Sequence, residues 1–288
     1  MEEAHPGLAW ASATEAGREW LEHLPRLVRE CVEQWSLEVG EPFPYAFASL
    51  ALAVRLPDGG DAVLKICFPH RESEHEADAL ARWNGEGAVR LLAHDRDRWA
   101  LLIERCSPGR HLRELEPGAA LEVMIGLLPR LWVPAGEPFR PLAEEAAWWA
   151  SYLLEKWEGT GRPFERELLD AALDALCSLS ASQGEQVLVN QDLHADNVLA
   201  AEREPWLVID PKPLIGEREF GIAGLVRAFE LGHTRRDVLY RLDRLTAELS
   251  LDRERARLWA LGQTVAWAFD SEFLPAHADT ARWLLSRS

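Results

Sequence analysis

Three oxygen-bearing side chains stand near the ends of two apolar runs in the C-terminal half of the chain. Asp192 and Asn197 lie five residues apart in a polar loop after 187–189, and Asp210 ends the run 207–209. Short apolar runs are typical of buried strands, and sites in mixed folds gather at strand ends. Hard cations such as Mg²⁺ bind oxygen ligands and commonly share them with substrate phosphates, and an Asp nearby can accept a hydroxyl proton. The pattern indicates phosphoryl transfer, provided that a nucleotide clamp exists elsewhere; the alternative is a solvated loop with coincidental acids.

The stretch Asp192-Leu-His-Ala-Asp-Asn197, together with Asp210, resembles the catalytic loop and metal-binding Asp of the protein-kinase-like antibiotic kinases. The wider run 192–227 resembles more narrowly the streptomycin 6-kinase and hydroxyurea phosphotransferase branch of the aminoglycoside phosphotransferase family. The resemblance implies a small-molecule kinase that transfers the γ-phosphate of ATP to a hydroxyl of a streptomycin-type acceptor. It implies that Asp192 accepts the proton of that hydroxyl, and that Asn197 and Asp210 bind Mg²⁺ bridging the nucleotide phosphates.

The sequence pattern in the first third of the chain predicts an antiparallel sheet and two helices. Apolar runs of strand type alternate with turn signals, and Pro57-Asp-Gly-Gly60 indicates a hairpin. Apolar residues at three- and four-residue spacing predict the first helix, within which Pro25 predicts a kink or a break. The expected elements are helices at 14–35 and 72–83 and strands at 37–39, 47–56, 62–68, 88–92 and 99–103, with a charged turn at 94–97.

Lys65 stands in the middle of the apolar run 62–66. A charge inside an apolar strand is costly unless it is paired, although strand alternation also permits a solvent-facing lysine. The resemblance implies a lysine that holds the α and β phosphates, with a helix glutamate as its counter-ion. Glu76 is the first choice for that glutamate and Glu72 the second, with Glu74 also a candidate; each is equally compatible with a solvated helix face.

Two further segments acquire a role through the resemblance. The stretch Glu104-Arg-Cys-Ser-Pro-Gly109 corresponds to the family's hinge between lobes, which implies that adenine is read by the Glu104 carbonyl and the Cys106 amide. The strand turn at 42–49 contains no glycine, which limits close backbone approach to phosphate. Ser49 is therefore expected to contribute a hydroxyl there.

Three other features of the sequence, two of them at or close to the loop, are each compatible with more than one role. Lys212 either reaches the transferred phosphate or is a solvated lysine. His194 alternates with acids, but Mg²⁺ does not favour imidazole and transition-metal sites usually add a second nitrogen or sulfur ligand, so a metal role is disfavoured. The pair Trp148 and Trp149 either lines an acceptor pocket or, as aromatic residues more often do, belongs to the core.

The sequence departs from the family pattern at two places besides the glycine-free turn at 42–49. Asn190 and Gln191 stand where the family has His-Gly, and Asn190 is expected to support the loop by hydrogen bonding in place of the histidine. Gly221 stands where the family has an Asp that accepts backbone hydrogen bonds from the catalytic loop, and glycine cannot do so. A catalytically impaired, nucleotide-binding relative of the same fold therefore remains the alternative function.

Beyond residue 110 the spacing of apolar residues predicts mainly helices, together with a small sheet that carries the loop. This order predicts an α+β, two-lobed protein-kinase-like fold: an N-lobe at 1–104 that clamps nucleotide, a hinge at 105–109, and a helical C-lobe at 110–288 with the catalytic loop and acceptor site. The helical patterns lie at 121–131, 142–157, 168–179, 220–231, 234–249, 252–269 and 275–285, and a loop is expected at 134–141.

Composition narrows the class of partner. With 48% apolar residues and a net charge of −17, the chain is a folded acidic protein that would repel nucleic acid. The charge suits a cationic, polyhydroxylated acceptor, for which Glu230, Asp270 and Glu272 are candidate contacts, although another small polar metabolite such as a sugar, choline or a hydroxyurea-like compound stays open. No Ala-Pro-Glu segment follows Asp210, which disfavours a protein kinase. Scattered cysteines, no signal-peptide pattern and no run of about 18 apolar residues predict a cytoplasmic protein without a membrane span.

Overall fold

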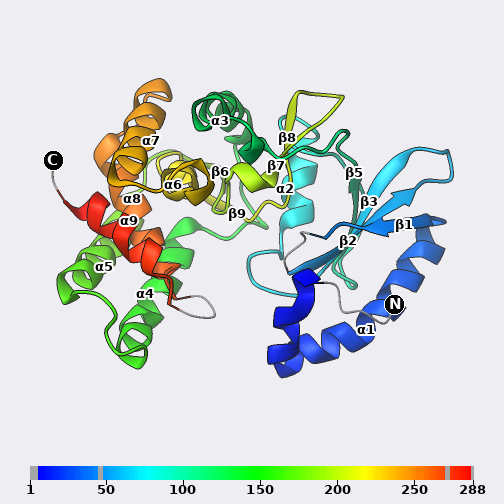
Figure 1. Cartoon of the computed structure of the whole chain (residues 1–288), viewed down its shortest axis with the longest axis horizontal. Coiled ribbons are helices and arrows are strands. Elements are labelled where there is room, and N and C mark those ends of the chain that lie inside the picture. Colours follow the sequence, from blue (N-terminus) through cyan, green and yellow to red (C-terminus); the bar gives the residue numbers. More distant parts are fainter. Residues whose placement is uncertain (1–5, 45–47, 270–272, 287–288) are drawn as a thin grey trace. The chain divides into compact units, whose positions relative to one another are not determined.

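The computed structural model describes residues 6–44, 48–269 and 273–286. The chain divides into two units, one formed by Met1–Gly109 with Ala201–Leu207 and the other by Arg110–Ala200 with Val208–Ser288. The first holds a five-stranded sheet, and the second is mainly helical with short strands (Figure 1). The predicted α+β class is therefore confirmed. Among the described residues, no helix combines the length and the apolar character needed to cross a bilayer.

The sheet of the first unit is antiparallel throughout and runs in the order β1-β2-β3-β5-β4. The predicted hairpin joins its second and third strands in unbroken register, from Ser49 opposite Cys67 to Arg55 opposite Asp61. The strands are β1 (Glu38–Pro42), β2 (Ser49–Arg55), β3 (Asp61–Cys67), β4 (Leu91–Asp95) and β5 (Ala100–Glu104).

Successive side chains of β2 and β3 point to opposite faces of the sheet, and the two faces contact different helices. One face packs in an apolar core with α1 (Glu15–Trp35) and η1 (Pro6–Ala13). The other face carries Lys65, which contacts the first residue of α2 (Glu76–Trp83), so the two helices lie on opposite sides of the sheet (Figure 1). The core face consists of Leu50, Leu52, Val54, Ala62, Leu64 and Ile66, against which α1 places Trp20, Leu24 and Val28.

Both helices of the first unit differ from their predicted form, and the strand predicted at 88–92 lies at Leu91–Asp95 instead. The helix α1 continues through Pro25 without a break, because its apolar stripe is buried against the sheet and tertiary packing offsets the lost backbone hydrogen bond. The second helix begins at Glu76 rather than at residue 72: residues 71–75 form turns, in which the Ser73 hydroxyl donates to the His70 carbonyl at 3.2 Å.

The second unit packs helices around a small antiparallel sheet, and chain segments between residues 198 and 208 form another two-stranded sheet. β6 (Gln186–Asn190) pairs with β9 (Pro213–Glu217), and β7 (Val198–Ala200) pairs with β8 (Trp206–Val208). Fully buried aromatic rings from three elements pack together in its core, with Phe220 6.1 Å from Trp149 and 5.5 Å from Trp259. The helices are α3 (Pro117–Leu131), α4 (Leu142–Gly159), α5 (Arg166–Ser180), α7 (Arg235–Glu248), α8 (Arg253–Ala266) and α9 (Pro275–Leu285), with η2 (Leu112–Glu114) before them.

The single helix predicted at 220–231 is wrong. The segment instead forms η4 (Phe220–Ile222), the five-residue α6 (Ala223–Arg227) and η5 (Phe229–Leu231). Two glycines inside it are in close contact with other segments: a Cβ on Gly221 would lie 2.7 Å from Trp132 Nε1, and one on Gly224 would lie 2.7 Å from the Leu193 carbonyl oxygen. These close approaches come from tertiary packing, which the periodicity of the segment does not record.

Substituting Gly221 by alanine is expected to destabilise the protein by about 1–3 kcal/mol, because the new methyl group overpacks the contact with the Trp132 indole. Gly126→Ala is the matched control: Gly126 lies in α3, and no described atom of another segment lies within 4 Å of the position that its methyl group would take. Alanine there should be neutral or stabilising by up to about 1 kcal/mol. Urea unfolding followed by circular dichroism measures both, and equal free energies of unfolding for the two variants would contradict the role assigned to Trp132.

Candidate active site

The loop between β6 and β7 is held at its start by Asn190. The buried Asn190 side chain accepts, through Oδ1, the backbone N–H groups of Asp192 at 3.1 Å and of Lys212 at 3.0 Å. These two bonds join the loop to the segment after β8. Asn190 thus supports the loop by hydrogen bonding, as expected of the residue that replaces the family's histidine.

Asn197 closes the other end of the loop. It ends η3 (Ala195–Asn197), and its Nδ2 donates to the Asp192 carbonyl at 3.2 Å. Because the amide nitrogen makes this bond, the amide oxygen is the atom that Asn197 can offer to a cation. The Ile209 N–H donates to the Asn197 carbonyl at 2.9 Å, so the residue before Asp210 is bonded to Asn197. The structure therefore brings together the chain segments that carry Asp192, Asn197 and Asp210.

Asp210 adopts an unusual backbone conformation directly after β8. Its φ is +50°, in the left-handed region, and its side chain is half-buried. Residues other than glycine seldom adopt this region, and such conformations cluster at functional sites where the surroundings impose them. The backbone at Asp210 therefore departs from the conformation of a continuing strand.

Lys212 lies against Asp192. Its Nζ is 2.5 Å from Asp192 Oδ2, and both side chains are about four-fifths buried, with 17% and 18% exposed. The solvated-lysine alternative is therefore wrong. The ammonium places a positive charge next to the carboxylate expected to act as a base, where it can also neutralise charge on an approaching phosphate.

The acids that flank the loop are engaged in holding it. Glu230 Oε1 accepts the Ala195 N–H at 2.8 Å, and Asp196 forms an ion pair with Arg113 at 2.9 Å. His194, Asp196 and Glu230 offer ligand atoms within 4.8 Å of one another, and one oxygen of each of the two carboxylates already has a protein partner. The other two acids named for acceptor binding, Asp270 and Glu272, lie outside the described residues.

In the first unit, Lys65 and Glu76 form a buried ion pair. Lys65 Nζ donates to both carboxylate oxygens of Glu76 at 2.6 and 2.7 Å, with 8% and 1% of the two side chains exposed. The Cys67 thiol also donates to Glu76 at 3.6 Å. Glu72 and Glu74, the other candidates, lie in the turns before α2. Burial at this level makes the pairing necessary, since an isolated buried charge is strongly unfavourable.

Ser49 shares the sheet face of Lys65. It begins β2 opposite Cys67, and Ala51, two residues on, stands opposite Lys65. Side chains two apart on a strand and directly opposite across a ladder project to the same face. The buried Ser49 and Lys65 therefore lie on the same face of the sheet. Residues 45–47 of the preceding turn lie outside the described residues.

An arginine that the sequence did not single out fixes the start of the expected hinge. Arg203 donates to both carboxylate oxygens of Glu104 at 2.8 Å, and also to the Gly85 and Ala88 carbonyls at 2.7 and 2.9 Å. Burial by itself would raise the pKa of Glu104, but hydrogen bonds from Arg203 and the Arg90 backbone outweigh it and the pKa is lowered. Nothing in the spacing around a lone arginine at a hairpin tip predicts this contact.

The remaining predicted residues separate into buried and exposed groups. Burial raises the pKa of the Cys106 thiol to about 12, so the thiol stays protonated and only its backbone is a candidate for ligand contact. Trp149 is fully buried in the core, whereas Trp148 is 43% exposed and packs edge-on against Tyr152 at 5.1 Å. The two tryptophans therefore do not form one pocket wall.

The sequence and fold place these residues in a known family. The family model for aminoglycoside/hydroxyurea antibiotic resistance kinases matches residues 34–272, which is well over half of the chain. The chain belongs to this family of antibiotic resistance kinases. It is thus an ATP-dependent small-molecule phosphotransferase, and the predicted family is confirmed.

Individual relatives of this resistance kinase match over most of their length. The chain is 44% identical to a hydroxyurea phosphotransferase from Kitasatospora aureofaciens, over 87% of this chain and 74% of that protein. It is 39% identical to a streptomycin 6-kinase from Streptomyces griseus, over 88% of this chain and 84% of that protein.

Solved structures support the fold of this resistance kinase. A choline kinase from Streptococcus pneumoniae superposes with a TM-score of 0.62 at 12% identity, over 91% of this chain and 98% of that one. A ternary complex of the aminoglycoside phosphotransferase APH(4)-Ia with ADP and hygromycin B superposes with a TM-score of 0.60 at 14% identity, over 89% of this chain and 94% of that one. The protein-kinase-like fold is thereby confirmed.

Proposed function

We propose that this resistance kinase transfers the γ-phosphate of ATP to a hydroxyl of a streptomycin-like aminoglycoside, with Asp192 as the base. The observation that carries the proposal is the loop geometry: Asp192 is held beside the Lys212 ammonium, and Asn197 is bonded to its carbonyl. The streptomycin 6-kinases from two Streptomyces species, at 39% and 38% identity, support the acceptor class.

The donor set near Asp192 fits Mg²⁺. Asn197 offers an amide oxygen, and the half-buried Asp210 offers a carboxylate. Both are hard oxygen donors of the kind that Mg²⁺ prefers, with neither imidazole nor thiolate among them. When bound there, the ion would neutralise charge on the nucleotide phosphates.

The residues of the chain divide the work of positioning and proton transfer. Asp192 accepts the proton of the acceptor hydroxyl at a carboxylate oxygen as the hydroxyl oxygen attacks the γ-phosphorus, and ADP leaves. Lys212 places a positive charge beside both the base and the incoming phosphate. Such positioning and charge neutralisation supply most of the catalysis in phosphoryl transfer.

The nucleotide contacts are assigned to the sheet face of Lys65. Lys65, oriented by Glu76, would hold the α and β phosphates, and the Ser49 hydroxyl on the same face would add a donor. The Glu104 carbonyl and Cys106 amide would read adenine, with Arg203 holding Glu104 in place. On this assignment residues 1–104 clamp the nucleotide, 105–109 form the hinge, and 110–288 carry the catalytic loop and the acceptor site.

A second candidate acceptor is hydroxyurea. It is favoured by the 44% identity to the hydroxyurea phosphotransferase, which exceeds the identity to either streptomycin kinase. The net charge of −17 argues for the cationic aminoglycoside, because an acidic protein attracts a cation over long range.

An acceptor panel tests the proposal. The purified protein is incubated with ATP and Mg²⁺ and with streptomycin, hygromycin B, choline or hydroxyurea, and ADP release is followed by a coupled assay. We expect turnover with streptomycin, a product that has gained one phosphate by mass spectrometry, and loss of turnover when EDTA removes Mg²⁺. Turnover with hydroxyurea alone would replace the proposed acceptor. Stabilisation by ATP and Mg²⁺ without turnover on any acceptor would instead identify a catalytically impaired relative.

A further inference from the structure

The place of the family's loop-holding Asp is filled by another side chain in this protein. Gly221 stands at that position, and a Cβ there would lie 2.7 Å from Nε1 and 3.3 Å from Cε2 of the Trp132 indole. A carboxylate side chain at 221 therefore cannot coexist with Trp132 in this arrangement. The loop that carries Asp192 must be held by other groups.

Two side chains from later in the chain make backbone hydrogen bonds on either side of Asp192. The fully buried Gln263 of α8 donates through Nε2 to the Gln191 carbonyl at 2.9 Å. Glu230 of η5 accepts the Ala195 N–H through Oε1 at 2.8 Å. One bond precedes the base by one residue and the other follows it by three, so they bracket the segment whose conformation aims the Asp192 carboxylate.

Arg227 sets the orientation of the Gln263 amide. Its Nη1 donates to Gln263 Oε1 at 3.1 Å, and its guanidinium lies over the Trp267 ring, 4.6 Å from the centroid. Arginine only donates hydrogen bonds, so the amide oxygen must face Arg227 and the amide nitrogen must face the Gln191 carbonyl. Burial lowers the pKa of Arg227 to about 10, against the attraction of Asp192 and Glu230. Arg227 therefore keeps its charge at neutral pH.

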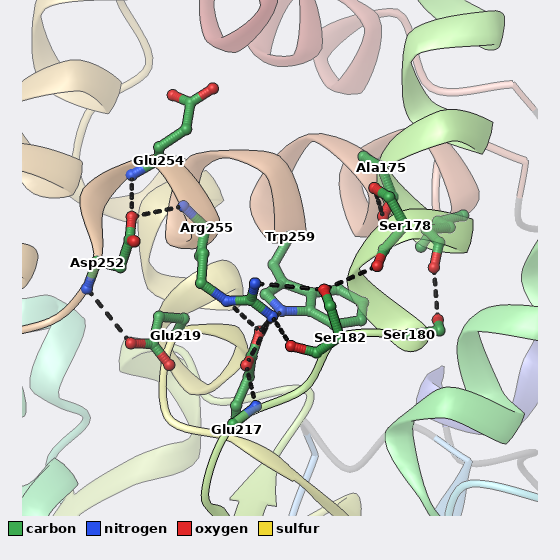
Figure 2. Close-up of polar contacts among 12 residues, drawn as sticks. Ala175, Ser178, Ser180, Ser182, Glu217, Glu219, Asp252, Glu254, Arg255 and Trp259 are labelled. Atoms are coloured by element: carbon green, nitrogen blue, oxygen red, sulfur yellow. Dashed lines mark hydrogen bonds and ion pairs between the residues drawn. The ribbon is translucent and has the colours of Figure 1, made fainter.

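The helix that carries Gln263, α8, is anchored by two other side chains on the same face of the helix. Arg255, Trp259 and Gln263 are spaced four residues apart in α8, so their side chains share one face of the helix. Figure 2 shows the first two converging on Glu217, the buried last residue of β9. Arg255 Nη2 donates to Glu217 Oε1 at 2.8 Å and Oε2 at 2.9 Å, and Trp259 Nε1 also donates to Glu217. The helix is thus fixed to β9 two turns before it reaches the loop.

We propose that Gln263 is a positioning residue for Asp192. The bond that Gln263 donates and the bond that Glu230 accepts together hold the loop in the absence of an Asp at position 221. The Gln263 amide is fixed on one side by Arg227 and on the other by a helix pinned to Glu217, so it holds the Gln191 carbonyl at a set place. This inference rests on the proposed role of Asp192 as the base. It explains how the loop is held although the family's usual acceptor is absent.

Gln263→Glu tests the proposal with almost no change in volume. A glutamate keeps an acceptor for Arg227 but has no donor for the Gln191 carbonyl. The substitution therefore removes the bond to Gln191 and places a carboxylate oxygen against the Gln191 carbonyl oxygen. We expect kcat to fall by about 10- to 100-fold, as for misplacement of a reacting group. KM for ATP should change less than about twofold, since the contacts assigned to adenine and to the α and β phosphates lie in the first unit. Gln263→Met, which lacks both bonds, should lower kcat at least as far.

Thr264→Val is the matched control. Thr264 is fully buried one position further along α8, and its hydroxyl has no hydrogen-bond partner within the described parts of the chain. Its loss should leave both kcat and KM unchanged. An equal fall in kcat for Thr264→Val and Gln263→Glu would show a general effect of altering α8 and would overturn the proposal, as would a wild-type kcat in Gln263→Glu.

Hydrogen exchange separates this inference from the proposed function. Backbone amide exchange in the peptide 190–197 needs neither nucleotide nor acceptor, and we expect it to be at least tenfold faster in Gln263→Glu than in the wild type and in Thr264→Val. If no acceptor is phosphorylated by the wild type, the proposed function fails, yet faster exchange still supports Gln263 as the group that holds the loop. Unchanged exchange in both Gln263→Glu and Gln263→Met overturns it whatever the activity shows.

Discussion

Replacing Asp192 with asparagine is expected to lower kcat by about 10²- to 10⁴-fold, the usual contribution of a positioned general base. Asparagine keeps the size of the side chain and an oxygen for Lys212, but it cannot accept the proton of the acceptor hydroxyl. ATP affinity should stay within about twofold of the wild type, because Lys65, assigned to the α and β phosphates, and its partner Glu76 lie in the first unit. The variant is measured by ADP release with the acceptor and by isothermal titration with ATP and Mg²⁺.

Asp170→Asn is the matched control for this prediction. Asp170 lies in α5 of the same unit, is half-exposed, and pairs only with Arg166 one helical turn away in the contacts that the structure gives it. Its neutralisation removes the same charge from the protein without touching the loop. A wild-type kcat in Asp192→Asn would end the assignment of Asp192 as the base, whereas a loss in Asp170→Asn as well would point to the total charge of the protein rather than to a local group.

Replacing Lys65 with methionine is expected to cost stability as well as nucleotide binding. The pair with Glu76 is almost fully buried, and removing one member of such a pair typically destabilises a protein by about 3–5 kcal/mol because the other charge is left in an apolar setting. The loss of the ammonium should also raise KM for ATP, since the lysine is assigned to the α and β phosphates. Urea unfolding and the ATP dependence of ADP release measure the two effects independently.

A double variant separates the loss of stability from the loss of nucleotide binding. In Lys65→Met with Glu76→Leu both charges are gone, and apolar replacement of a buried pair is often neutral or stabilising, so we expect stability to return while KM for ATP stays raised. Arg55→Met on β2 is the control, because its pair with Asp61 is exposed and 3.8 Å long, and such pairs contribute about 0–1 kcal/mol. Recovery of ATP binding in the double variant would show that Lys65 serves only the structure.

The two predictions concern different units, which gives them independent outcomes. The Lys65–Glu76 pair depends on β3 and α2, whereas Asp192 depends on the Asn190, Asn197 and Lys212 contacts. A protein that binds ATP through the first group but lacks turnover would be the impaired relative that the departures at 190, 191 and 221 allow. The bonds from Asn190, Gln263 and Glu230 argue against that outcome, because they restore support at the places where the family residues are absent.

Local patterns along the chain determined much of this protein. The β2–β3 hairpin followed from strand alternation around Pro57-Asp-Gly-Gly60, and α9 followed from helical spacing with the same limits, Pro275–Leu285, as predicted. The need of Lys65 for a partner followed from the cost of an unpaired charge in an apolar strand, and the family resemblance put Glu76 first among the candidates. These features depend on near neighbours in sequence, or on a motif short enough to be recognised, so the order of residues is enough to predict them.

Tertiary structure decided the contacts between residues that lie far apart in the sequence. Gln263 contacts a carbonyl 72 positions away, Arg203 contacts a carboxylate 99 positions away, and Gly221 is required by an indole from another element. Each of these partners is chosen by which elements pack together, and a glutamine in a helix or a glycine in an apolar run has the same local signature whether or not it meets one. Periodicity and spacing indicate the face of an element on which a residue lies. Its distant partner is determined only in the folded chain, where most buried polar groups are hydrogen-bonded.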